Sequence, residues 1–293
     1  MNTLGIDIGG TAVKVALRDQ TEFVTGISSE YARPTRELLD RMIREAIELL
    51  PNDRMKTVQR VGLCVPGRRA PDNQSIELAV NVPGLVGYPF QEIVANAIGH
   101  SAQIELLGDA EAATQDATAC CPGARRVLGI AIGTGVGIAL IEDGQSIGIG
   151  SDGIGHFGQI DVGPIGDGST LGSKVGPDGG RNSLEAYLGL PALQARFGAA
   201  LPERIAALPN DDPAIIAMSR AIRIGLAVYA PDAVFILGGL GLAIAPLSSQ
   251  IDAMVRDDLT SAAPRSWRLG FGVSRFHAAR GAASAAGVSM RSE

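Results

Sequence analysis

The sequence has 293 residues, enough for two domains, and its 46% content of hydrophobic residues indicates a folded globular protein. The formal net charge is −6, and the basic residues are scattered along the chain, which argues against nucleic acid as a partner. The longest apolar stretch, residues 127–141, spans about 15 residues and contains several glycines, whereas a membrane-spanning helix needs roughly 20. We therefore predict no association with a membrane.

The first residues carry no cluster of positive charge and run directly into an apolar strand, so we expect no secretory signal and a cytoplasmic location. The three cysteines, Cys64, Cys120 and Cys121, have the spacing of neither a zinc pair nor a C-x-x-C redox pair. We expect them to be reduced and to have plain packing roles.

The most informative feature is an internal repeat. Residues 4–11 read Leu-Gly-Ile-Asp-Ile-Gly-Gly-Thr, and residues 128–135 read Leu-Gly-Ile-Ala-Ile-Gly-Thr-Gly. Each copy is an apolar strand followed by a glycine-rich turn and a second apolar strand, over residues 12–17 and 136–141 respectively, which is typical of a β-hairpin. The repeat therefore predicts two hairpins of related design.

Glycines in such a turn allow positive φ angles and let main-chain N–H groups approach a polyphosphate. For either turn alone, a tight hairpin without a ligand is the alternative interpretation. The repetition favours phosphate binding. Asp7 of the first copy is replaced by Ala131 in the second, and one carboxylate together with phosphate oxygens is what Mg²⁺ requires.

Strands and helices alternate along the rest of the chain, which indicates an α/β fold. Residues 148–180 are rich in glycine and are predicted to be a long loop region of a second domain. The other predicted elements are a helix capped by Thr35 and reaching Leu50, a strand at 58–65, a helix at 90–98 ended by Gly99, a strand at 103–107, helices at 109–119, 183–197 and 213–229, a strand at 233–237, a helix after Gly238-Gly239 that runs through 259, a strand near 269–273 and a terminal helix from Phe276.

Five motifs, in this order along nearly the whole chain, resemble the ROK family of sugar kinases and repressors. They are Asp7-Ile8-Gly9-Gly10-Thr11, Gly133-Thr134-Gly135-Val136-Gly137, Gly155-His156, Leu237-Gly238-Gly239 and Gly281-Ala282-Ala283. The resemblance implies a two-domain actin-like, ribonuclease-H-like ATPase fold with a duplicated hairpin core. It implies a small domain of residues 1–108, with part of the terminal helix 276–293 packing on it, a larger domain of residues 109–275, and ATP and sugar in the cleft between them.

The resemblance also implies ATP-dependent phosphoryl transfer to a hydroxyl of a monosaccharide, such as a hexose or an N-acetylhexosamine. Asp109 resembles the catalytic aspartate, which would accept the proton of the sugar hydroxyl. Capping of the following helix is the alternative role, and the two are compatible. The residues implied to bind Mg²⁺ and ATP are Asp7, Gly9, Gly10, Thr11, Lys14, Gly133, Thr134, Gly135, Gly137, Gly238 and Gly239, with Asp7 holding the metal ion and the last two near the adenosine.

Asn81, His156 and Glu185 are implied to bind the sugar together with Asp109. Amide, imidazole and carboxylate groups are suited to neighbouring hydroxyls. Without the resemblance, Asn81 is a turn residue near a proline, His156 a loop histidine and Glu185 a carboxylate in the first turn of a helix. Both interpretations remain open from the sequence.

The chain departs from the family pattern at three places. Many members carry a cysteine-rich zinc motif after the Gly-His pair, but residues 157–180 contain no cysteine, so we predict no structural zinc and expect residues 163–168 to be ordered by other contacts. Gly153 stands where the family has glutamate, and Gly108 where it has asparagine before the catalytic aspartate. Both changes remove groups that would bind sugar hydroxyls, so we expect an altered specificity and do not assume glucose.

Two alternatives to a kinase follow from these departures and from the family. The first is a catalytically weak or inactive sugar-binding or regulatory protein with the same fold. The second is a transcriptional repressor, whose helix-turn-helix would precede the Asp7 motif; only six residues do so here. A homodimer is implied by the resemblance alone.

Overall fold

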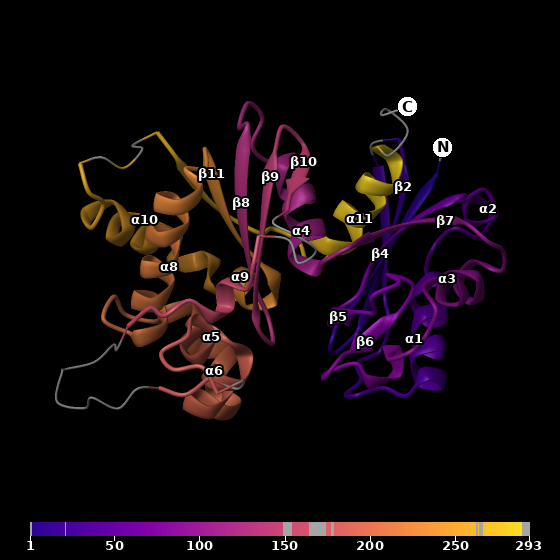
Figure 1. Cartoon of the computed structure of the whole chain (residues 1–293), viewed down its shortest axis with the longest axis horizontal. Coiled ribbons are helices and arrows are strands. Elements are labelled where there is room, and N and C mark those ends of the chain that lie inside the picture. Colours follow the sequence, from indigo (N-terminus) through magenta and orange to yellow (C-terminus); the bar gives the residue numbers. More distant parts are fainter. Residues whose placement is uncertain are drawn as a thin grey trace. The chain divides into compact units, whose positions relative to one another are not determined.

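The structure is a computed structural model that describes residues 2–20, 22–148, 154–163, 174–176, 179–261, 263 and 266–288. The chain forms two compact units, shown in Figure 1. Unit 1 comprises Met1–Asp116 and Phe276–Glu293, and unit 2 comprises Ala117–Arg275. The division falls within α4 (Asp109–Thr118), so Asp109 lies in unit 1. Gly153 and residues 164–168, discussed above, lie outside the described residues.

Unit 1 is built on a five-stranded sheet with the order β3-β2-β1-β4-β7. The first three strands are antiparallel, and β1, β4 and β7 are parallel. Their bounds are β1 Thr3–Ile8, β2 Val13–Asp19, β3 Glu22–Ile27, β4 Arg60–Cys64 and β7 Gln103–Leu107, and a separate two-stranded ribbon pairs β5 Arg68–Arg69 with β6 Ile76–Leu78. The first predicted hairpin is therefore confirmed.

The helices of unit 1 begin and end where local chemistry predicts. The hydroxyl of Thr35 accepts a hydrogen bond from the Leu38 N–H at the start of α1 (Arg36–Glu48), as expected for an N-cap. Gly99 ends α3 (Phe90–Ile98) in the left-handed conformation with φ +79°. The remaining helices are α2 Asn52–Met55, a 3-10 turn Pro83–Leu85, α4 Asp109–Thr118 and α11 His277–Val288.

Glycines let α11 approach the sheet of unit 1 closely. Gly5 and Gly62 are neighbours on β1 and β4, and a Cβ atom on either would collide with the main chain of α11, at Ala279 and Ala282 respectively. In Figure 1, α11 accordingly lies along this sheet. The C-terminal segment is thus an integral part of unit 1.

Unit 2 repeats the architecture with the strand order β10-β9-β8-β11-β12. Its first three strands are again antiparallel, and β8, β11 and β12 are parallel. The strands are β8 Arg126–Ile132, β9 Val136–Glu142, β10 Gln145–Ile147, β11 Ala233–Leu237 and β12 Arg268–Phe271. The duplication seen in the sequence therefore extends from one hairpin to the whole sheet.

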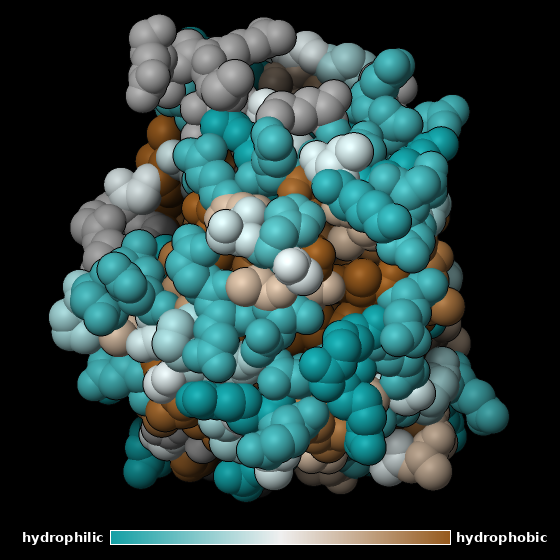
Figure 2. Space-filling view, turned by 90° about the vertical axis from the view of Figure 1, so that its right-hand side faces the viewer, coloured by the Kyte–Doolittle hydropathy of each residue, from teal (hydrophilic) through white to brown (hydrophobic). Residues whose placement is uncertain are grey.

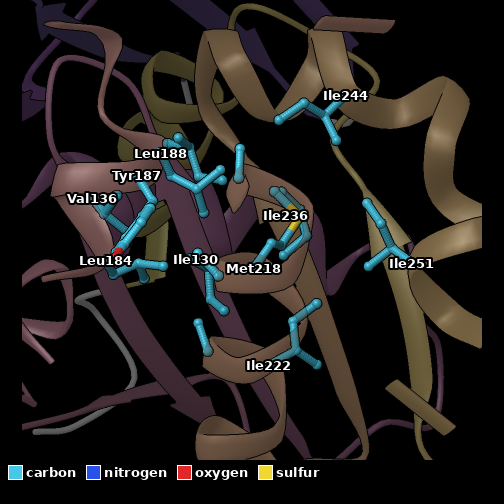
Figure 3. Close-up of a cluster of buried hydrophobic side chains, with 14 of the residues drawn as sticks. Ile130, Val136, Leu184, Tyr187, Leu188, Met218, Ile222, Ile236, Ile244 and Ile251 are labelled. Carbon is cyan, nitrogen blue, oxygen red and sulfur yellow. The ribbon is translucent and has the colours of Figure 1, made fainter. Parts of the chain in front are cut away.

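The core of unit 2 lies between this sheet and its helices. Figure 3 shows Ile130 and Ile236 of the sheet together with Met218 and Ile222 of α8, all buried. The helical elements are a 3-10 turn Phe157–Gln159, α5 Leu184–Leu188, α6 Leu190–Phe197, a 3-10 turn Gly198–Ala200, α7 Leu201–Arg204, a 3-10 turn Ile205–Ala207, α8 Pro213–Tyr229, α9 Gly238–Ile244, a 3-10 turn Ala245–Leu247 and α10 Ser248–Asp257.

Two predictions of long single helices were wrong. The helix predicted at 183–197 is broken at Gly189, whose backbone is extended with φ −61° and ψ 146°. Pro191 follows in the first turn of α6, and proline tolerates a helix start but not a helix interior. The helix predicted from Gly238 through 259 is divided into α9 and α10 by the 3-10 turn that contains Pro246, without an extended residue between them.

The face of the molecule in Figure 2 is mainly hydrophilic, with a smaller hydrophobic area visible between polar side chains. Some exposed apolar surface is normal for a folded protein. Within the described part of the chain, no helix is long and apolar enough to cross a membrane.

Candidate functional site

The first glycine loop, Gly9-Gly10-Thr11, joins β1 to β2 in unit 1. Asp7 and Lys14 face each other across this hairpin, and the Lys14 Nζ lies 3.3 Å from Asp7 Oδ2. Asp7 is only 6% exposed. Burial raises the pKa of Asp7, Lys14 lowers it in part, and the charge of Asp109 raises it further. The carboxylate is thus incompletely compensated, which suits the binding of a cation.

Tyr31 and Ala12 form hydrogen bonds with the main chain of this loop: Tyr31 donates to two carbonyl groups, and the Ala12 carbonyl accepts from one N–H group. The Tyr31 hydroxyl donates to the Gly9 carbonyl at 2.7 Å, and the Tyr31 N–H donates to the Thr11 carbonyl at 2.8 Å. The Gly9 N–H donates to the Ala12 carbonyl at 3.1 Å. Among the described residues, the N–H groups of Gly10 and Thr11 have no hydrogen-bond partner. They remain available to an anionic ligand.

Asp109 follows β7 and is the first residue of α4. Its side chain is exposed, and its Oδ1 accepts a hydrogen bond from the Ala110 N–H at 2.7 Å. The Gly108 N–H donates to Glu111 Oε2 at 3.2 Å, so Glu111 helps to cap this helix. Burial raises the pKa of the nearby Cys64 thiol well above its usual range, and the charges of Asp7 and Asp109 raise it further. Asp7, Cys64 and Asp109 are therefore close enough to interact electrostatically.

Asn81 also lies in unit 1. Asn81 is exposed and lies just before the 3-10 turn Pro83–Leu85. Its side chain makes no hydrogen bond to any residue that the structure describes. The adjacent Val80 is 66% exposed, so this predicted sugar contact stays a prediction.

The second glycine loop, Gly133-Thr134-Gly135, joins β8 to β9 in unit 2 and is held by Glu185. The Val136 N–H donates to Glu185 Oε1 at 2.7 Å. A Cβ atom on Gly135 would lie 2.6 Å from the same oxygen. The Gly133 N–H donates to the Gly135 carbonyl at 2.9 Å, and the Leu190 N–H donates to the Gly133 carbonyl at 3.0 Å. The break between α5 and α6 thus supplies a donor to the loop.

His156 is exposed, and its ring has no hydrogen bond to the described residues. Its carbonyl accepts a hydrogen bond from the Gln159 N–H at 3.0 Å, which closes the 3-10 turn Phe157–Gln159. Gln159 Nε2 donates to Glu185 Oε2 at 3.1 Å, and Gly158 lies directly against the Glu185 side chain. The segment that carries His156 is therefore packed against Glu185.

Gly238 also lies beside the second loop. Its φ is +81°, and a Cβ atom there would collide with the carbonyl group of Ile132, which precedes Gly133. Only glycine meets both requirements. By contrast, Gly239 faces open space, and Gly137 lies in β9 opposite Ala131. Unit 2 thus brings together the second loop, Glu185 and Gly238.

Two contacting residues were missed from the sequence, Tyr31 on the first loop and Gln159 on Glu185. Neither belongs to a motif with a fixed spacing. Tyr31 is 22 positions from Gly9, and Gln159 follows a loop histidine. No short-range pattern would have found them.

Within the described residues, no three His, Cys, Asp or Glu side chains gather as metal ligands would. A cavity of about 750 Å³ lies in unit 2 between α8, residues 258–260 with Ala263, and residues 161–162. Its lining includes Arg220, Arg223 and Leu259 but none of the predicted site residues.

Two sheets with the same strand order, each beginning with a hairpin whose turn is rich in glycine, define an actin-like ATPase fold. The ROK family model matches residues 3–287, and the chain belongs to the ROK family. Sugar kinases and transcriptional regulators both occur among the similar proteins.

A curated relative is the N-acetyl-D-glucosamine kinase of Vibrio cholerae, which is 29% identical over 143 residues. The match covers 48% of this chain and 46% of that protein, or about half of each. The ROK hexokinase of Thermus thermophilus matches over 100% of both chains with a TM-score of 0.72 and 20% identity. A ROK family glucokinase from Streptomyces griseus, solved in complex with glucose and AMPPNP, matches over 98% of this chain and 99% of its own with a TM-score of 0.68 and 19% identity.

A ROK family transcriptional regulator, a homolog of the E. coli MLC protein, matches over 96% of this chain and 76% of its own, with a TM-score of 0.69 and 17% identity. At such identities the structural matches establish the fold alone. The assignment of an activity depends on the side chains.

Proposed function

We propose that this protein is a carbohydrate kinase that transfers the γ-phosphoryl group of ATP to a hydroxyl of a monosaccharide, such as a hexose or an N-acetylhexosamine. The observation that carries the proposal is the exposed carboxylate of Asp109, which interacts electrostatically with the buried Asp7 beside a loop that has unpaired N–H groups. A base, a metal-binding carboxylate and a phosphate-binding loop are the parts that phosphoryl transfer requires.

In this proposal, Asp109 accepts the proton of the sugar hydroxyl. The Ala110 N–H holds Oδ1, whereas Oδ2 has no hydrogen bond to the described residues and is free to receive the proton. As the proton moves to Oδ2, the hydroxyl oxygen forms a bond to the γ-phosphorus. The bond from that phosphorus to the bridging oxygen breaks, and ADP leaves with the electron pair.

The N–H groups of Gly10 and Thr11 and the ammonium of Lys14 would bind phosphate oxygens, together with Gly9 and with Gly133, Thr134, Gly135 and Gly137. Gly238 and Gly239 would lie near the adenosine. Asp7 fits Mg²⁺ because its buried carboxylate has, among the residues that the structure describes, only the Lys14 ammonium at 3.3 Å as an ion-pair partner. Mg²⁺ bound with the nucleotide would neutralise charge that develops on the phosphates.

Glu185, His156 and Asn81 are proposed to bind the sugar. The oxygens of Glu185 accept from Val136 and Gln159, but each carboxylate oxygen accepts more than one hydrogen bond. Glu185 is therefore able to hold the second glycine loop and accept from a sugar hydroxyl at the same time. The relatives that are named as N-acetylglucosamine kinase, hexokinase and glucokinase support a sugar as the acceptor.

The test is ADP release from Mg²⁺-ATP in the presence of aldoses, ketoses, N-acetylhexosamines and polyols. We expect one class of sugar to stimulate release, and Asp109→Asn to lower kcat by about 10²- to 10⁴-fold, the usual contribution of a general base. Asp53→Asn, at an exposed aspartate of α2, is the matched control and should retain full activity. If a sugar binds but none stimulates ADP release, the protein is a sugar-binding or regulatory member of the family instead.

A further inference from the structure

Tyr31 contacts the first glycine loop twice, once with its side chain and once with its main chain. The hydroxyl reaches the Gly9 carbonyl, and the N–H reaches the Thr11 carbonyl. Tyr31 is only 8% exposed, so the ring is fixed by its surroundings. One residue thus binds both ends of the loop.

The segment that leads to Tyr31 reinforces this arrangement. The Ser28 N–H donates to the Val13 carbonyl at 2.9 Å, and the Ser28 hydroxyl accepts from the Val13 N–H at 3.0 Å. Residues 28–31 therefore continue the pairing of β3 with β2 beyond the strands and along the loop. The position of the Tyr31 hydroxyl is determined by the sheet.

We propose that Tyr31 is a positioning residue that holds Gly9 and Thr11 by their carbonyl groups, so that the N–H groups of Gly10 and Thr11 are preorganised for nucleotide phosphates. This inference rests on the proposed function. Glycines lose more conformational freedom on ordering than other residues. A loop that is already ordered binds its ligand more tightly, because less entropy is lost on binding.

The chemistry of the phenol suits this role. Burial raises the pKa of Tyr31 far above its usual range, and the negative charge of Asp7 raises it further. The hydroxyl therefore keeps its proton and donates to Gly9 over the whole pH range in which a kinase is assayed. A carboxylate could not replace it, because the loop presents a carbonyl oxygen that needs a donor.

The experiment compares Tyr31→Phe with Tyr88→Phe, in the presence of Mg²⁺. Tyr88 is the control because it is also buried in unit 1, and its hydroxyl donates to Asp40 at 2.6 Å, not to the loop. We expect Tyr31→Phe to weaken the binding of a non-hydrolysable ATP analogue, measured by titration calorimetry, by about fivefold to tenfold, as for the loss of one hydrogen bond. The KM for ATP should rise by the same factor, with the KM for the sugar unchanged.

Hydrogen exchange gives a readout that a purely structural role would not move. We expect faster exchange of the two paired amides, the Gly9 N–H and the N–H of residue 31, in Tyr31→Phe and no change at these positions in Tyr88→Phe. Wild-type nucleotide affinity and exchange in Tyr31→Phe would overturn the inference, and so would an equal rise in the KM for the sugar.

The same measurements separate this inference from the proposed function. If the wild type binds nucleotide but no sugar stimulates ADP release, the proposed function is overturned. The calorimetric titration of Tyr31→Phe with the ATP analogue still decides the role of Tyr31. If the wild type is an active kinase and Tyr31→Phe behaves like it, only the role of Tyr31 is overturned. If the wild type binds no nucleotide, both are overturned.

Discussion

The two glycine loops occupy equivalent places in two sheets of the same strand order, yet different side chains hold them. In the first loop, main-chain carbonyl groups accept hydrogen bonds from Tyr31, and the N–H groups of Gly10 and Thr11 stay unpaired among the described residues. After the second loop, the N–H of Val136 donates to the carboxylate of Glu185. The repeat has thus kept its strands while its loops acquired different partners.

The charges beside the two loops differ as well. Asp7 pairs with Lys14 across the first hairpin, whereas Ala131 pairs with Gly137 at the equivalent place in the second. Only the first hairpin therefore carries a buried carboxylate and an ammonium at this position. The two hairpins therefore share a backbone architecture but differ in charge. We accordingly assign the binding of the metal-bound phosphates to the first hairpin.

The largest effect is expected when the charge of Asp7 is removed. We expect Asp7→Asn to lower kcat by about a hundredfold or more, because the carboxylate proposed to hold Mg²⁺ is lost. The rate should be measured as ADP release at saturating sugar. Asp19→Asn, at an exposed ion pair with Arg54 at the far end of β2, is the control. Equal activities of Asp7→Asn and the wild type would contradict the metal assignment.

The same substitution should change the pH dependence of stability. The pKa of Asp7 is raised in the folded protein, mainly by burial, from an ordinary value of 3.8. Well below that value the carboxyl is protonated in both states, and its ionisation contributes nothing to the free energy of unfolding. As the pH rises above it, the unfolded chain loses the proton more readily than the folded protein, so the free energy of unfolding of the wild type falls. We expect the Tm of Asp7→Asn to exceed that of the wild type at neutral pH, and the difference to shrink as the pH is lowered below 3.8, as measured by thermal unfolding across this pH range.

A smaller effect is expected at the second loop, where two glycines provide a matched pair. A Cβ atom on Gly135 would meet Glu185 Oε1, whereas one on Gly133 would have no atom within 4 Å. Gly135→Ala should displace the carboxylate and raise the KM for the sugar by about tenfold, consistent with the loss of a hydrogen bond to a charged group. Gly133→Ala should change it little. Equal effects of the two variants would show that Glu185 does not act through this contact.

The smallest effect is expected at Gly108, which precedes Asp109 between β7 and α4. A Cβ atom there has no neighbour within 4 Å, and the residue has no positive φ, so Gly108→Asn should be accepted without strain. The new amide would supply the group that the resemblance to the family implies before the catalytic aspartate. We expect a change of a few-fold in the ratio of kcat/KM values between sugars, measured over the same panel. An unchanged ratio would indicate that the sugar does not reach this position.

Much of the fold could be predicted from local patterns. The hairpins, the strand at 103–107 and the helices at 90–98 and 213–229 have the predicted positions, because apolar periodicity and capping residues act within a few positions. The prediction of one helix at 183–197 was wrong, because Gly189 and Pro191 interrupt it. The Leu190 N–H donates instead to the Gly133 carbonyl. A short edge strand such as β10 (Gln145–Ile147) carries too weak a pattern to be recognised alone.

The sequence by itself determined the repeat, the alternation of strands and helices and the resemblance to the family, because each depends on short stretches of neighbouring residues. The tertiary structure alone decided how each loop is held, and by which side chain. Tyr31 meets Gly9 across 22 positions and Glu185 meets Val136 across 49, and no local propensity extends over such distances. Contacts of this kind depend on how strands and helices pack within each unit, and they arise only once that packing is complete.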